Sequence, residues 1–161
     1  MGIEIERKFL VIGDAWRTPT GVAIGQGYLN RDKQRTVRVR VAGSQAFLTI
    51  KGPSQGATRL EFEYPIPAAD ALQLFELCDG AVILKTRHVV MHDGNRWEID
   101  EFHADNQGLI VAEIELITED QAFAKPDWLD REVTDDPRYF NSSLISHPFC
   151  QWYLSPAPLS A

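Results

Sequence analysis

Pairs of like charges at alternating positions constrain this chain more than any other feature of its sequence. Glu4 and Glu6 are separated by one apolar residue, and so are Arg38 and Arg40 further along. Because side chains alternate between the two faces of a β-strand, each pair predicts a strand with one charged and one apolar face. Like charges that lie close together on one sheet face are destabilising, so a compensating ligand or counter-charge is expected.

The same alternation recurs along most of the chain and predicts eight strands. Residues with turn preferences separate them, among them Gly43, Pro53 and Gly94. The expected strands span residues 2–11, 22–30, 35–43, 45–51, 58–66, 82–91, 95–102 and 109–117. A helix is expected over residues 67–78, where a proline precedes apolar residues at helical spacing. From about residue 119 onward the sequence suggests helical and irregular structure, which makes the whole chain an α+β protein.

Length and composition narrow the class of protein. The 161 residues fit one domain, expected over residues 1–155, with a frayed tail over residues 156–161. The 16 Lys and Arg residues against 23 Asp and Glu give a formal net charge of −7, so broad nucleic-acid binding is not expected. The sequence has no run apolar enough for a membrane span and no signal-peptide pattern, which indicates a cytoplasmic protein without a membrane partner.

An eight-stranded antiparallel β-barrel with its charged faces inward and helices packed outside accounts for the alternation. Basic side chains on several walls could grip a compact polyanion, while carboxylates could hold Mg²⁺ or Mn²⁺ beside the phosphate oxygens. The inferred ligand is a chain of phosphates that carries metal. An open, solvated charged sheet is the alternative. In the barrel, aromatic residues such as Trp97, Trp128 and Trp152 would pack outside against helices.

Short charged motifs along the chain resemble those of the CYTH superfamily, the triphosphate tunnel metalloenzymes. The similarity spans roughly residues 2–145 and includes a C-terminal pattern around Arg131, Tyr139 and Asn141. The motifs, in order, are Glu4-x-Glu6-x-Lys8, Arg38-x-Arg40, Thr49-x-Lys51, Glu61-x-Glu63, Lys85-x-Arg87, Glu98-x-Asp100 and Glu113-x-Glu115. The resemblance implies a tunnel of eight antiparallel strands, dependence on Mg²⁺ or Mn²⁺, and a triphosphate as substrate. The compact length is most like that of the small bacterial inorganic tripolyphosphatases.

The resemblance also implies a role for each charged residue. The residues expected to bind substrate phosphates are Lys8, Arg38, Arg40, Lys51, Arg59, Lys85 and Arg87. The residues expected to bind metal are Glu4, Glu6, Asp100, Glu113 and Glu115. The remaining carboxylates are expected to orient metal-bound water or to form ion pairs, and they are Glu61, Glu63 and Glu98.

Lys85 and Tyr28 are the residues expected to activate the attacking water. Nearby cations would lower the pKa of the Lys85 amine and make it a proton acceptor. Tyr28 could orient that amine through a hydrogen bond, or it could be a plain core aromatic residue. A carboxylate or a metal hydroxide is an alternative base.

Hydrolysis of inorganic tripolyphosphate is the expected activity. Class IV adenylate cyclisation and hydrolysis of thiamine or nucleoside triphosphates are alternatives within the same family. A non-catalytic polyphosphate-binding module is an alternative of another class. A small polyanionic triphosphate is the expected partner, and the oligomeric state stays open, with a homodimer as one option.

Overall fold

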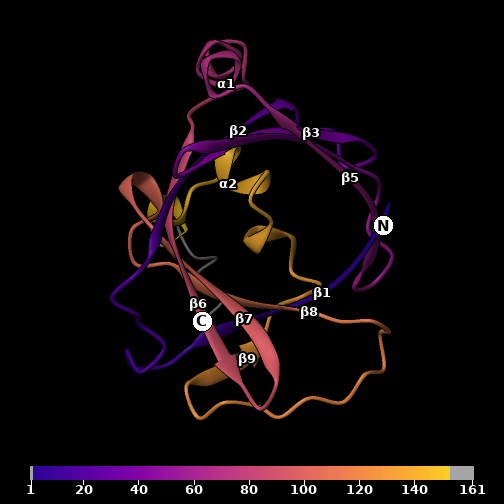
Figure 1. Cartoon of the computed structure of the whole chain (residues 1–161), viewed down its shortest axis with the longest axis vertical. Helices are drawn as coiled ribbons and strands as arrows, with labels where there is room; N and C mark the ends of the chain where they lie inside the picture. Colours follow the sequence, from indigo (N-terminus) through magenta and orange to yellow (C-terminus); the bar gives the residue numbers. More distant parts are fainter. Residues whose placement is uncertain (1, 153–161) are drawn as a thin grey trace, which may run out of the picture.

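The computed structural model describes residues 2–152, in which eight antiparallel strands close into one barrel (Figure 1). Each expected strand is present, with small shifts at its ends, so the predicted barrel is confirmed. The strands are β1 (Gly2–Val11), β2 (Val22–Asn30), β3 (Thr36–Ala42), β4 (Gln45–Lys51), β5 (Thr58–Ile66), β6 (Ile83–His92), β7 (Asn95–Phe102) and β8 (Ile110–Glu115).

Strand β1 closes the barrel because it pairs along both of its edges. On one edge it pairs with β8, with Lys8 opposite Glu113. On the other edge it pairs with β5, with Glu4 opposite Arg59. The order around the barrel is therefore β1-β5-β4-β3-β2-β6-β7-β8.

A ninth strand, β9 (Leu129–Glu132), lies in the region where helical and irregular structure was expected. It pairs with the second half of β1, opposite Phe9 and Val11. The expectation is wrong for these four residues because partnership with β1 makes them a strand. Three of these four residues are charged, so the local sequence has no alternation of polar and apolar residues that would identify a strand.

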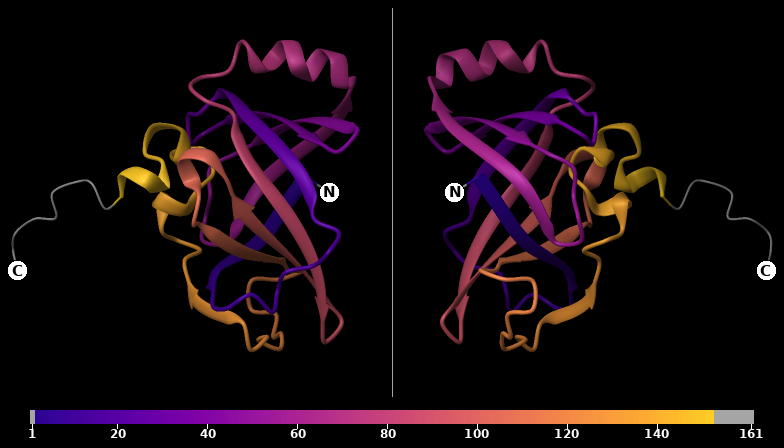
Figure 2. Two further views of the ribbon diagram at one scale, coloured as in Figure 1. Left: turned by 90° about the vertical axis from the view of Figure 1, so that its left-hand side faces the viewer. Right: turned by 90° about the vertical axis from the view of Figure 1, so that its right-hand side faces the viewer.

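Helix α1 (Ala68–Phe75) covers the outer face of β2, β3 and β4 (Figure 2). It begins directly after Pro67, whose ring fixes the backbone ahead of the first turn. Ala71 is fully buried and packs with Val39 and Ala46 of the barrel wall. The helix is shorter than the expected 67–78, because the chain turns after Phe75 and leaves Cys78 outside it.

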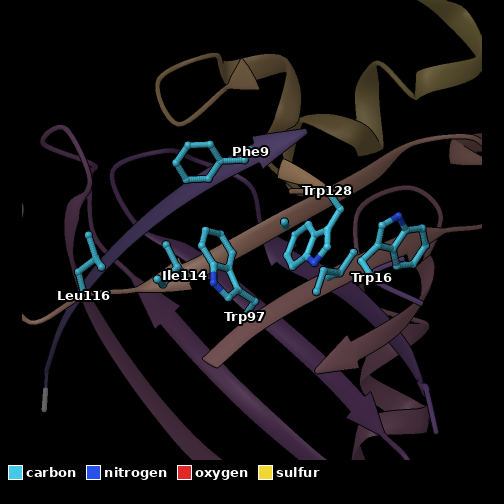
Figure 3. Close-up of a cluster of buried hydrophobic side chains, with 8 residues drawn as sticks. Phe9, Trp16, Trp97, Ile114, Leu116 and Trp128 are labelled. Carbon is cyan, nitrogen blue, oxygen red and sulfur yellow. The ribbon is translucent and has the colours of Figure 1, made fainter. Parts of the chain in front are cut away.

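A second outer cluster covers the wall formed by β1, β7 and β8 (Figure 3). Trp97 is fully buried there and makes edge-to-face contacts with Phe9 and Trp128, with ring centroids 5.8 and 5.6 Å apart. Residues 12–18 and 117–128 lie over this wall as loops. The expectation that Trp97 and Trp128 pack against helices is therefore wrong, although both do lie outside the barrel.

After β9 the chain runs across one end of the barrel (Figures 1 and 2). Tyr139 and Leu144 of this segment are buried with Tyr28 and Phe102 of the barrel. The short helical elements are η1 (Ala104–Asn106) between β7 and β8, then η2 (Pro137–Tyr139), α2 (Ser143–Ser146) and η3 (Phe149–Gln151) in the C-terminal segment. The tail expected over residues 156–161 lies outside the described residues. None of the helices within residues 2–152 is long and apolar enough to cross a membrane.

Candidate active site

The barrel encloses a cavity of about 310 Å³ whose lining is mostly charged. Fifteen of the sixteen residues predicted for the site line this cavity, and Asp100 is the exception. The C-terminal segment adds Phe140, Asn141 and Ser142 to the lining. The side chains that the sequence distributes over eight strands are thus brought together around one space.

The lining carboxylates are confined to one part of the cavity wall, and another part carries only basic side chains. Strands β2, β3 and β6 are neighbours, and every charged residue they contribute to the lining is basic. All the lining carboxylates come from β1, β5, β7 and β8. We call the first group of strands the cationic side and the second group the acidic side. The sequence pattern contains both charge sets, but their separation follows from the strand order.

Two arginines of β3 dominate the cationic side. Arg38 donates to Thr49 Oγ1 at 3.1 Å, and Arg40 donates to Gln26 Oε1 at 3.0 Å. Neither guanidinium forms a salt bridge with a carboxylate of the described residues, and the buried Arg38 Nε has no hydrogen-bond partner. Burial, reinforced by the neighbouring Arg38 and Arg87, lowers the pKa of Arg40 to about 10. The Arg40 guanidinium remains cationic at neutral pH, and both side chains are available to an anion.

Lys85 lies at the boundary between the two sides and is almost fully buried. Its Nζ is 2.8 Å from Asp100 Oδ2 and donates to Asn141 Oδ1 at 3.1 Å. Burial lowers the pKa of the Lys85 amine to about 7, because the repulsion from Arg87 and Arg40 adds to desolvation and outweighs the attraction of Asp100. The amine can therefore exist in its neutral form near neutral pH.

Asp100 is occupied by its basic neighbours. Arg87 donates to both carboxylate oxygens, from Nε at 2.8 Å and from Nη2 at 2.9 Å. Burial alone would raise the pKa of Asp100, but Lys85 and Arg87 outweigh burial and hold it well below its usual value. Asp100 is fully buried and does not line the cavity, so its geometry is that of an anchor for Lys85 and Arg87.

A hydrogen-bonded network joins the C-terminal segment to the cationic side. Gln26 Nε2 donates to Asn141 Oδ1 at 2.9 Å and to Tyr28 Oη at 3.3 Å. Tyr28 therefore reaches Lys85 only through Gln26 and Asn141 within the described contacts. Sequence reasoning assigned no role to Gln26 or Asn141, although Asn141 belongs to the C-terminal motif that carried the family resemblance.

The carboxylates of the acidic side are partly neutralised by lysines. Lys51 Nζ lies 3.1 Å from Glu4 Oε1 and 3.2 Å from Glu61 Oε2. Burial still raises the pKa of Glu4, against the attraction of Lys51. Burial also acts to raise the pKa of Glu61, but its hydrogen bonds with Glu4 and Lys51 outweigh burial and lower it.

Glu6 and Glu113 form a buried carboxyl pair on the acidic side. Burial and the nearby Glu113 raise the pKa of Glu6 well above its usual value. For Glu113, the charge on Lys8 and the hydrogen bond from Glu6 outweigh burial and lower the pKa. Of the two carboxyl groups, Glu6 is therefore the one that holds a proton more readily.

These carboxylates fit a hard divalent cation whose remaining coordination positions are filled by substrate oxygens. Within residues 2–152, no three His, Cys, Asp or Glu side chains are arranged as a ready-made metal site. Mg²⁺ typically uses only one or two carboxylates together with substrate phosphates and water, and the Glu6–Glu113 pair offers that number. A cation there would favour the ionised form of Glu6. Glu115, whose pKa is raised by burial and by Glu4 and Glu98, is a third oxygen donor on the same side.

Arg59 and Glu63 line the cavity but differ from the buried core of the site. Arg59 donates from Nε and Nη2 to the carbonyl oxygen of Gly52, at 3.0 and 2.8 Å. Glu63 is exposed to solvent. Both side chains therefore belong to the opening of the cavity, where they can meet an entering anion or cation.

Comparison with known protein families identifies a match to this sequence. The CYTH domain model matches residues 2–146, which is nearly the whole of the described chain. The chain belongs to the CYTH family. The CYTH resemblance seen in the sequence motifs is thereby confirmed.

Relatives in this family include named enzymes. The chain is 50% identical over 151 residues to the inorganic triphosphatase of Acetivibrio thermocellus, which covers 92% of this chain and 97% of the relative. It is 36% identical over 145 residues to the inorganic triphosphatase of Nitrosomonas europaea, with coverage of 88% and 95%. A crystal structure of an inorganic triphosphatase superposes with a TM-score of 0.64 at 34% identity, covering 88% of this chain and 93% of the other.

Proposed function

We propose that this protein hydrolyses inorganic tripolyphosphate with the help of Mg²⁺ or Mn²⁺. The observation that carries the proposal is a pair of arginines, the buried Arg38 and the partly buried Arg40, that form no salt bridge with a described carboxylate and face a carboxylate-lined wall across one cavity. Catalysis of phosphoryl transfer consists mostly of positioning and charge neutralisation, which this arrangement supplies. The names of the two relatives support inorganic triphosphate as the substrate.

The basic residues of the cavity would bind the substrate in two ways, by direct hydrogen bonds and through their charge. Arg38 and Arg40 have no carboxylate partner, so they would hold phosphate oxygens directly as forked donors. Arg87 already bonds to Asp100, and Lys51 to Glu4, so their cations would act mainly through their charge. The remaining cations of the lining are Lys8, Arg59 and Lys85.

The acidic side would hold the divalent cation. Glu6 and Glu113 are its central ligands in this proposal, with Glu4 and Glu115 beside them and the other lining carboxylates in supporting roles. The bound cation would supply charge neutralisation along the phosphate chain and polarisation of the phosphoryl group that is attacked. Asp100 is left out of the ligand set because Lys85 and Arg87 occupy its oxygens.

Lys85 is the proposed acceptor of the proton from the attacking water. A neutral amine has two N–H groups, which match its two oxygen neighbours on Asp100 and Asn141. Its lone pair is then left for a water molecule in the cavity. Asp100 and Asn141 hold the amine directly, and Tyr28 contributes through Gln26.

The direct test is phosphate release from tripolyphosphate, ATP and thiamine triphosphate, each measured with Mg²⁺, with Mn²⁺ and with a chelator. We expect metal-dependent release from tripolyphosphate well above the other two substrates. Assays with ATP are also analysed for cyclic AMP, whose formation would assign the protein to the cyclases instead. Tight binding of tripolyphosphate without turnover would reduce the protein to a binding module.

A further inference from the structure

Gln26 is a buried polar residue of β2 that lies behind the wall of the cavity. Its exposed fraction is 0%, and it does not line the space that a substrate would fill. Its side-chain amide is nevertheless fully used. Nε2 donates to Asn141 Oδ1 at 2.9 Å and to Tyr28 Oη at 3.3 Å, and Oε1 accepts from Arg40 Nε at 3.0 Å. Gln26 therefore connects three residues that do line the cavity.

The hydrogen-bond donors at the two ends of these contacts fix how both amides are oriented. The Nε–H of Arg40 can only donate, so the Gln26 atom that faces it is the amide oxygen. The amide nitrogen of Gln26 then points to Asn141, so the Asn141 atom that it meets is also an oxygen. Lys85 Nζ donates to this same Asn141 oxygen at 3.1 Å. The contacts thus run without interruption from Arg40 to Lys85, and each amide has one orientation that suits both of its neighbours.

A reversed Asn141 amide would work against Lys85. Its Nδ2 would then face the amine, and a neutral amine would accept that hydrogen bond with the lone pair that the attacking water needs. Gln26 opposes the reversal, because the Nδ2 hydrogens of Asn141 would then lie against the Nε2 hydrogens of Gln26, donor against donor. Leaving a buried donor without an acceptor is unfavourable. Gln26 thus keeps the oxygen of Asn141 turned towards Lys85.

Gln26 acts on Arg40 through the same amide. It occupies only Nε, so the two Nη groups of Arg40 stay available to phosphate oxygens. Gln26 and Arg40 are also opposite one another in the pairing of β2 with β3, so the strand register and the side-chain contact hold the guanidinium together. The group that binds phosphate and the group that accepts the proton are therefore both held through one buried side chain.

We propose that Gln26 is a positioning residue, which keeps the amide oxygen of Asn141 on Lys85 and holds the guanidinium of Arg40 for the substrate. The proposal rests on the proposed triphosphatase activity, and it adds a direct link between phosphate binding and proton transfer. The distance between a phosphate bound to Arg40 and the water beside Lys85 is then set by one side chain. Catalysis depends on such distances, because small displacements of the reacting groups reduce the rate strongly.

Gln26→Met tests the proposal, because methionine has a similar length but no amide. We expect kcat for tripolyphosphate at saturating metal to fall ~10-fold, which is the size of effect that one lost hydrogen bond produces. KM should change less than ~3-fold, since Arg38 and Arg40 remain to bind the substrate. Gln45→Met is the matched control, because Gln45 is exposed at the start of β4, and kcat should not change.

The double variant Gln26→Met with Asn141→Ala separates positioning from a general structural role. If Gln26 acts through Asn141, kcat should fall no further in the double variant than in either single variant. Two independent structural losses would instead multiply to ~100-fold. Circular dichroism and a thermal melt establish that the variants are folded. Gln26→Glu replaces Gln26→Met if that variant does not fold, because it keeps the acceptor for Arg40 and removes the donor to Asn141, and the same pattern of kcat is expected.

Nuclear magnetic resonance of the Asn141 side-chain amide provides a readout without turnover. In the protein without substrate or metal, Gln26→Met should shift or split this signal, because both amide orientations become accessible, and Gln45→Met should leave it unchanged. An unaltered Asn141 signal in Gln26→Met overturns the proposal. So does an unchanged kcat, a rise in KM alone, or multiplied losses in the double variant. If the unmodified protein does not hydrolyse tripolyphosphate, the proposed function fails, and the Asn141 signal still decides the role of Gln26.

Discussion

The two sides of the cavity bury their charges in different ways. On the acidic side, Lys51 lies within 3.2 Å of Glu4 and Glu61, so part of the charge is balanced inside the protein. On the cationic side, Arg38 and Arg40 have no carboxylate within salt-bridge distance among the described residues. Buried charge without a partner is unfavourable, so the cationic side gains most from a bound anion.

The acidic side would gain from a bound cation, whereas the cationic side gains from a bound anion. Burial and the nearby Glu113 raise the pKa of Glu6 well above its usual value, so a second negative charge is costly there. A divalent cation would therefore compete with a proton on this side, whereas the arginines of the cationic side need to lose no proton to bind an anion. Metal binding is thus expected to weaken as the pH falls, and direct arginine contacts with phosphate are not.

Lys85→Arg should have the largest effect, because it keeps the positive charge and removes the group that can be neutral near pH 7. We expect kcat to fall about 10³-fold with a smaller change in KM. Arg17→Ala is the matched control, since Arg17 pairs with Glu101 outside the cavity. Full turnover by the Lys85→Arg protein would rule out the amine as proton acceptor.

The pH dependence of the unmodified enzyme tests the same residue. The pKa of Lys85 is lowered to about 7, so the proton acceptor is available above that pH and lost below it. The rate at saturating metal should therefore rise with pH and level off above about 7. A rate that is flat from acid to neutral pH would contradict this assignment.

Arg40→Ala should have the next largest effect, because it removes a cation that forms no salt bridge with a carboxylate of the described residues. We expect kcat/KM for tripolyphosphate to fall about 10²-fold. Thermal stability without substrate should stay the same or rise, since a buried charge without a carboxylate partner is removed. A large loss of stability would mean that Arg40 serves mainly to hold the barrel together.

Glu6→Gln tests the acidic side and should have a smaller effect that depends on metal. We expect the affinity for Mg²⁺ or Mn²⁺, measured by titration, to fall roughly 30-fold. Because the pKa of Glu6 is raised in the fold, its ionised form destabilises the metal-free protein at neutral pH, and acid relieves this. The metal-free variant should thus be at least as stable as the unmodified protein at pH 7, with the difference vanishing in acid. Glu76→Gln, on the surface after α1, is the control.

Asn141 variants should have the smallest effect and the most specific signature. Asn141→Ala removes the acceptor for Lys85 and Gln26, and we expect kcat to fall about tenfold with little change in KM. Asn141→Asp keeps both acceptor contacts but adds a negative charge, so the midpoint of the pH–rate profile should move upward. Ser146→Ala, in α2, is the control. An unchanged midpoint in Asn141→Asp would remove Asn141 from the positioning of Lys85.

Alternation of charged and apolar residues predicted the strands, and together with the family resemblance it predicted the barrel and the charged residues that line its cavity. A strand such as β3, with Arg38 and Arg40 between valines, has one arrangement that buries the valines under α1 and turns the arginines inward. The period of two carries this information locally. It does not identify β9, which exists because β1 has an open edge beyond β5.

Contacts between distant residues account for what the sequence did not reveal. Gln26 and Asn141 are 115 positions apart and meet only because the C-terminal segment crosses the end of the barrel. The family resemblance implied a metal-binding role for Asp100, whereas the structure pairs its carboxylate with Arg87 across β6 and β7. Which carboxylates are free depends on strand register, and register is set by the whole fold.

The double pairing of β1 has a consequence for the order of folding. The residues of β1 pair only with β5, β8 and β9, which come much later along the chain. Glu4, for example, is opposite Arg59, and Lys8 is opposite Glu113. Closing loops of that length is slow and entropically costly, so the hairpins from β2 to β5 and from β6 to β8 can form first. Glu4 and Glu6 reach their places only in the final closure. The last step of folding would therefore also assemble the wall that is proposed to bind metal, and an incompletely folded chain would have the arginines of the cationic side but lack half of the proposed site.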